Sequence, residues 1–239
     1  MPRSRILHLA AWAAYATIAA VHVAAMGTSA DGLTLVTQPL TGPLLLLVLV
    51  TAAPHADRTS VLVGLALLCS SIGDLLPSLV ALTDARTIPA AAFLLAVALY
   101  CAALAPLWAR SRDRMRYLLA IPYIAIVVGL YLAFAKGAGQ LMPLLAPYAV
   151  VLAAMAFFAA GVNALTWVGG TLFMLSNALL GMLWFLPGAW TPHSDTAVMV
   201  TYFASQALLV AGFIRTFPQR RWEIGPADRG SGSMLILEG

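Results

Sequence analysis

Residues 60–82 read SVLVGLALLCSSIGDLLPSLVAL, and this stretch decides the fold class. A helix needs about 20 apolar residues to cross the hydrocarbon core of a bilayer, and here Asp74 is the only charged residue. The rest of the chain is similar, because 62% of its 239 residues are hydrophobic and only 9% are charged. Soluble domains have roughly 25% charged residues. The composition therefore predicts a membrane protein and excludes a soluble globule, a disordered chain, a nucleic-acid binder and a disulfide scaffold.

Further apolar stretches of similar length lie on both sides of this one. They cover residues 6–26, 38–54, 87–109, 115–135, 141–161, 163–186 and 193–214. The sequence therefore predicts an all-α bundle of about eight transmembrane helices in a single domain over residues 1–215. Residues 216–239 include a Gly-Ser-Gly-Ser run, so we expect a disordered cytoplasmic tail there.

The basic residues are distributed unevenly about these eight spans. Eleven of the thirteen fall on the side that holds both chain ends, and only Arg86 and Lys136 fall on the opposite side. Basic residues beside membrane helices stay preferentially in the cytoplasm. We therefore predict a protein of the plasma membrane with both termini in the cytoplasm.

Two halves of the chain share weak sequence signatures. The pattern Pro-Leu-x-x-Pro occurs at 39–43 and again at 143–147, and the polar positions 71–74 are matched by 174–177. These offsets predict two repeats of four spans, at residues 5–110 and 115–215, related by an axis along the membrane normal. Chance similarity between leucine-rich helices is the alternative.

Asp74 is the first candidate for chemistry, because it is the only acidic residue deep inside a span. A carboxyl group at that depth costs a few kcal/mol and is by default a functional hypothesis. Asn177 occupies the corresponding position of the second repeat, and we expect it to meet Asp74 across the repeat axis. The alternative for both residues is a hydrogen bond that only holds helices together.

Other polar side chains in the spans could line a cavity around these two. The candidate substrate-binding residues are Gln38, Ser71, Tyr148, Ser176, Tyr202 and Gln206. Tyr202 and Gln206 lie on one helix face, since residues i and i+4 are neighbours on a helix. No His, Cys or carboxylate set has the spacing of metal ligands, so the sequence predicts no metal site.

In order and spacing, these motifs resemble the YhhN family of integral membrane proteins, whose characterised members are lysoplasmalogenases. The resemblance spans about residues 5–215 and is carried by segments 37–44, 67–76, 147–148, 172–177 and 199–206. It implies an eight-helix enzyme that hydrolyses the vinyl ether bond of a lysoplasmalogen without a cofactor. The products would be a fatty aldehyde and a glycerophospho-base.

Vinyl ether hydrolysis begins with protonation of the β-carbon, and water then captures the oxocarbenium ion. Such a site needs one proton donor and one group that holds water. A carboxylic acid in apolar surroundings suits the first role, so Asp74 is the predicted general acid. The resemblance implies a second Asp at Asn177, a Lys at Gln38 and a His near Leu104, and this sequence has none of the three.

Three functions stay open from the sequence. The leading hypothesis is a lysoplasmalogenase-like hydrolase whose partner is a lipid or lysophospholipid, with Asp74 and Asn177 at its catalytic centre. The second is a non-catalytic protein of the same fold that binds or moves a lipid or amphiphile. The third is a proton-coupled transporter with Asp74 as carrier, although the spans offer no basic partner. The oligomeric state is left open.

Overall fold

The computed structural model describes residues 3–53, 57–79, 86–110, 114–186, 188–189 and 191–217. Within these ranges the chain is helical and has no strand. The α-helices are α1 (Arg3–Gly27), α2 (Asp31–Ala52), α3 (Arg58–Leu79), α4 (Thr87–Ala109), α5 (Ala120–Phe134), α6 (Met142–Ala160), α7 (Ala164–Phe185) and α8 (Ser194–Ile214). Two short 3-10 helices, η1 (Arg114–Leu119) and η2 (Gly139–Leu141), precede α5 and α6.

The described helices confirm the all-α class and the eight predicted spans, each long and apolar enough to cross a membrane. The second span differs most, since α2 begins at Asp31 rather than at residue 38. The helix runs through Pro39 and Pro43 instead of starting beside them. Its acidic first residue also suits the positive end of the helix dipole. The fifth span begins as the 3-10 helix η1 before α5 takes over.

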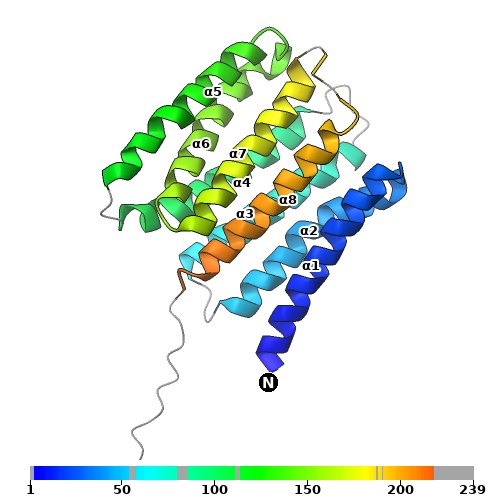
Figure 1. Ribbon diagram of the computed structural model, residues 1–239, viewed down its shortest axis with the longest axis vertical. Helices are drawn as coiled ribbons and strands as arrows, with labels where there is room; N and C mark the ends of the chain where they lie inside the picture. The colour runs from blue at the N-terminus through cyan, green and yellow to red at the C-terminus, as the bar shows by residue number, and fades with distance from the viewer. Residues whose placement is uncertain are drawn as a thin grey trace, which may run out of the picture.

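The helices form one elongated bundle with α1 and α2 at one edge and α5 at the other (Figure 1). Helix α8 is the most central, because 50% of its most apolar window is buried, against 11% for α5. The start of α1 and the end of α8 lie at the same end of the bundle (Figure 1). Arg58, Arg110 and Arg215 flank helix ends on that same side. The predicted tail lies outside the described residues from residue 218 onward.

Helix packing follows one scheme in the two halves. Helix α2 packs on α3 and α3 on α4, as α6 packs on α7 and α7 on α8. Across the halves, α4 contacts α6 and α8 contacts α2. A duplication with a two-fold axis would give this arrangement. The repeat itself stays a prediction, since shared packing does not establish common ancestry.

Large apolar side chains divide between a packed core and an outer surface. Tyr100, Phe173 and Phe213 are fully buried among the helices. Leu132 and Val150 are 66% and 67% exposed, and both lie within the membrane spans. Apolar side chains that face outward along a span face lipid rather than water. The chain is therefore an integral membrane protein.

Two close helix contacts depend on glycine. A Cβ at Gly42 of α2 would overlap the Ser71 hydroxyl and the Leu67 carbonyl of α3. A Cβ at Gly212 of α8 would collide with the first turn of α7, which Asn163 caps through its side chain. Small residues let membrane helices approach closely enough for van der Waals contact. Gly42 allows the close approach of the two helices that carry Gln38 and Asp74.

Gly42→Leu should destabilise the bundle by about 1–3 kcal/mol, because the larger side chain forces α2 away from α3. The measurement is thermal unfolding in detergent. Unfolding is monitored by the labelling of Cys69 and Cys101, which are both free and partly buried. Gly129→Leu on α5 is the matched control, because a Cβ there has no atom within 4 Å. Equal melting temperatures for the two variants would contradict the close α2–α3 contact.

Candidate functional site

Asp74 lies on α3 with its carboxyl group inside the bundle and only 7% of the residue exposed. It is five residues from the end of the helix, or about 7.5 Å at 1.5 Å per residue. Gln38 of α2 donates from Nε2 to Asp74 Oδ1 at a distance of 2.9 Å. The Tyr202 hydroxyl of α8 donates to Asp74 Oδ2 at a distance of 3.0 Å. The carboxyl group thus joins three helices. Neither of these partners is charged.

A second layer of polar groups supports Tyr202. Gln206 Nε2 lies 3.3 Å from the Tyr202 hydroxyl and 3.2 Å from Ser70 Oγ, and donates to both. The Tyr100 hydroxyl donates to Gln206 Oε1 at 2.5 Å. Helices α3, α4 and α8 all contribute to this layer. The chain of hydrogen bonds therefore runs from the buried Tyr100 to the Asp74 carboxyl.

The prolines of α2 help to place Gln38. Pro39 has no N–H to donate, so the helix lacks one of its backbone hydrogen bonds beside Gln38. Two buried threonines next to Gln38 bond back to carbonyls of their own helix: Thr41 Oγ1 donates to the Gln38 carbonyl at 2.9 Å, and Thr37 Oγ1 donates to the Leu33 carbonyl at 2.7 Å. The Gln38 amide itself is turned to Asp74.

A cavity of about 90 Å³, part of it open to the surroundings, lies beside this network between α4, α5, α6 and α7. Most of its walls are apolar, and no Lys, Arg, Asp or Glu lines it. The lining side chains with polar atoms are Tyr131, Tyr148, Asn177 and Trp184. The cavity therefore suits a hydrocarbon chain with a neutral polar group.

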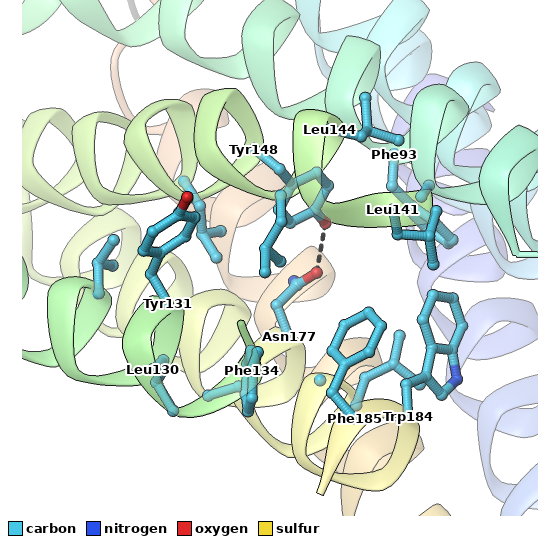
Figure 2. Close-up of a pocket in the computed structure, with 18 residues that line it drawn as sticks. Phe93, Leu130, Tyr131, Phe134, Leu141, Leu144, Tyr148, Asn177, Trp184 and Phe185 are labelled. Carbon is cyan, nitrogen blue, oxygen red and sulfur yellow. Dashed lines mark hydrogen bonds between the residues drawn. The ribbon is translucent and has the colours of Figure 1, made fainter. Parts of the chain in front are cut away.

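Tyr148 and Asn177 face each other across this cavity (Figure 2). The Tyr148 hydroxyl donates to Asn177 Oδ1, and Asn177 Nδ2 donates to the Phe173 carbonyl at 2.8 Å. An amide has two N–H donors and two acceptor lone pairs. These two bonds use one of each. The pair can therefore still bind a hydroxyl group, an ether oxygen or a water molecule.

Phe93 contacts both the cavity and the residues around Asp74. Its ring lines the cavity, stands edge-on to the Tyr202 ring at 6.1 Å, and packs against Gly73, where a Cβ would lie 2.9 Å from the ring. Asp74 does not line the cavity, whereas Asn177 does. The expectation that Asp74 and Asn177 meet is therefore not what the structure shows. They belong to two adjacent polar centres, because each bonds to a tyrosine from a different helix.

The six predicted binding residues divide in the same way. Gln38, Tyr202 and Gln206 join the Asp74 network, and Tyr148 lies in the cavity with Asn177. Ser71 Oγ donates to the Leu67 carbonyl of its own helix at 3.0 Å, and Ser176 Oγ donates to the Val198 carbonyl of α8 at 2.9 Å. Both serines thus make packing contacts outside the cavity. Their role in substrate binding stays a prediction.

Two residues of this region were not predicted from the sequence as part of the site. Tyr100 is a lone hydroxyl in the apolar middle of α4, and that isolation was a usable signal. Phe93 is one of many aromatic residues in apolar runs, so no pattern could have singled it out. In the described part of the chain, no group of three His, Cys, Asp or Glu residues could hold a metal ion.

Comparison with known proteins gives one match. No curated protein and no solved structure matches the chain. The family model described as the YhhN family matches residues 33–213, a range that contains the Asp74 network and the whole cavity. This match covers most of the 239 residues. The chain belongs to the YhhN family.

Proposed function

We propose that this protein is a membrane hydrolase that cleaves the vinyl ether bond of lysoplasmalogen-type lipids, with Asp74 as general acid. The observation that carries the proposal is a buried carboxyl group with neutral partners, one aromatic ring away from an apolar cavity. Membership of the YhhN family supports the same reaction through the resemblance described above. We place the protein in the plasma membrane with cytoplasmic termini on the charge distribution alone.

The hydrogen bonds of Asp74 suit an acid that must give up its proton. A carboxyl group buried without a charged partner costs less in its neutral form. Gln38 and Tyr202 both donate, so neither engages the proton of the acid. Once that proton is transferred, the same two donors stabilise the carboxylate, one at each oxygen. The site therefore favours the neutral acid before the reaction and supports the anion after it.

The reaction can be balanced with this one carboxyl group. Asp74 transfers its proton to the β-carbon of the vinyl ether, and the double bond becomes an oxocarbenium ion beside the new carboxylate. Water adds to the cationic carbon, and its proton returns to Asp74. The resulting hemiacetal breaks its bond to the glycerol oxygen, giving the aldehyde and the free hydroxyl group. Asn177 cannot accept a proton, so its role is to hold water or the glycerol portion.

A lipid in the cavity reaches Asp74 only if the Phe93 ring moves. The ring lines the cavity and contacts Tyr202, which itself bonds to the acid. Side-chain rotation of an aromatic ring about χ1 would join the cavity to the carboxyl group. Phe93 is thus placed to exclude water from Asp74 until the substrate is bound.

A non-catalytic lipid-binding protein is the second candidate. It is favoured by the separation of Asp74 from the cavity and by the absence of an ionisable carboxyl group at Asn177. Under this reading, Asp74 joins helices and the cavity binds an amphiphile unchanged. Release of aldehyde from a vinyl ether lysolipid distinguishes the two candidates.

Asp74→Asn should lower aldehyde release by about 10²–10⁴-fold, because the amide has no acidic proton to transfer. Purified protein in nanodiscs would be assayed with a lysoplasmalogen. Asp31→Asn is the control, since Asp31 is also acidic but lies exposed in the first turn of α2. No aldehyde from the wild type with any vinyl ether lysolipid would reject hydrolysis in favour of the binding protein. Full activity in Asp74→Asn would reject Asp74 as the acid.

Phe93→Trp should lower aldehyde release by roughly tenfold or more, because a larger ring blocks the passage to Asp74 and displaces the substrate. Phe93→Ala should keep at least the wild-type rate. Ile124→Trp is the matched control, since Ile124 faces outward on α5 and is 56% exposed. If Phe93→Ala is as inactive as Phe93→Trp, the ring positions the substrate rather than separating two compartments.

A further inference from the structure

The two basic residues on the side opposite the termini both lie at the rim of the cavity. Arg86 immediately precedes α4, and Lys136 follows α5 by two residues. The lining residues of α4 come from its first turns, and those of α5 from its last turns. The cavity therefore lies in the half of the bundle where these two cations are found, and their position calls for an explanation other than cytoplasmic retention.

Arg86 contacts the wall of the cavity directly. Its guanidinium carbon lies 5.5 Å from the centre of the Trp184 ring, and Nη1 donates to the Trp184 carbonyl at 3.3 Å. Trp184 lines the cavity from α7, and Ala90, one turn after Arg86 on α4, lines it too. The hydrogen bond to Trp184 uses one of the five N–H donors of the Arg86 guanidinium group, and the residue is exposed. The group can thus face a ligand at the cavity mouth.

Lys136 is exposed and lies in the turn after α5. Its neighbour Gly137 packs against the Phe185 carbonyl so closely that a Cβ would overlap it. Phe134, Phe185 and Trp184 line the cavity, so the Lys136 turn borders the same rim as Arg86. Positive charge at both positions makes the mouth attractive to an anion, while the interior has no charged residue.

The depth of the polar groups matches the layout of a lysolipid. Tyr148 is six residues from the start of α6 and Asn177 eight from the end of α7, or about 9 and 12 Å at 1.5 Å per residue. A phospholipid presents its anionic phosphate at the surface, neutral oxygen atoms below it and its chain deeper still. The rim cations, the Tyr148–Asn177 pair and the apolar walls follow the same order.

We propose that Arg86, assisted by Lys136, binds the phosphate of a single-chain phospholipid whose chain occupies the cavity. Guanidinium groups match phosphate with parallel N–H donors, and Trp184 holds the Arg86 group in place from below. This assignment rests on the proposed function for the class of lipid, but it concerns binding and not bond cleavage. It makes Arg86 a determinant of head-group specificity.

The test uses a lipid that cannot be hydrolysed by this chemistry, a 1-alkyl lysophospholipid with a brominated chain. Purified full-length protein in nanodiscs is titrated with it, and quenching of tryptophan fluorescence reports chain binding near Trp184. The same titration of Trp184→Phe measures the quenching of the remaining tryptophans, which is subtracted from the wild-type signal. A brominated 1-alkylglycerol of equal chain length has no phosphate and serves as the comparison ligand.

Arg86→Gln should weaken binding of the lysophospholipid by about tenfold, the effect of losing one charge-assisted hydrogen bond. Binding of the alkylglycerol should not change. Lys136→Gln should have a smaller effect in the same direction, and high salt should reduce the difference between the two ligands. Arg110→Gln is the matched control, because Arg110 is an exposed helix-end arginine at the opposite end of the bundle. It should bind both ligands like the wild type.

Two results would overturn the head-group site. Wild-type affinity in Arg86→Gln would show that Arg86 anchors the helix end at the membrane surface only. Equal losses for both ligands would show that Arg86 merely supports Trp184. Binding that depends on Arg86, in a protein that releases no aldehyde, would reject the proposed hydrolysis and keep this site. If Arg86→Gln hydrolyses the lipid with an unchanged KM, the head-group site is rejected and the proposed hydrolysis is kept.

Discussion

The burial of one carboxyl group inside a lipid-facing bundle is the constraint on which this structure depends. Asp74 has no charged partner among its described contacts, so neutral donors must satisfy both of its oxygen atoms. Those donors come from α2 and α8, which brings the first and last parts of the chain onto α3. Gly42 allows α2 to approach, and Gln206 with Tyr100 holds the Tyr202 hydroxyl from behind. A group that costs free energy to bury thus specifies how four helices meet.

The two halves of the bundle pack alike but hold different polar centres. The Asp74 centre gathers groups from α2, α3, α4 and α8, whereas the Asn177 centre pairs α6 with α7 beside an open cavity. The two bonds of the Asn177 amide leave one N–H donor and one acceptor lone pair for a ligand in the cavity. The Asp74 carboxyl group is buried and has a donor at each oxygen atom.

The charge distribution of the chain also has a consequence for the site. Basic residues are numerous in the segments predicted to lie at the end of the bundle where α1 begins and α8 ends, which supports the proposed orientation. Arg86 and Lys136 lie at the other end, next to residues that line the cavity, and they reduce the difference in charge between the two ends. Cations at the mouth of an uncharged cavity can select a lipid by its head group, while the apolar walls select it by its chain. Under the two proposals, binding and proton transfer are tasks of different residues, so that each could be altered without the other.

The eight spans, the position of the acid in the third span and the family could all be predicted from the residues alone. Hydropathy over about 20 residues suffices for the spans because every backbone group must be hydrogen-bonded within the membrane. The start of α2 was not predictable, since a proline-containing helix and a helix that begins at its proline look alike in a sequence. The folded arrangement was needed to show that Asp74 and Asn177 lie in separate centres, that Phe93 contacts both the cavity and the Asp74 network, and that Arg86 contacts Trp184. Each of these depends on the rotation and spacing of neighbouring helices, which a pattern of apolar residues does not encode.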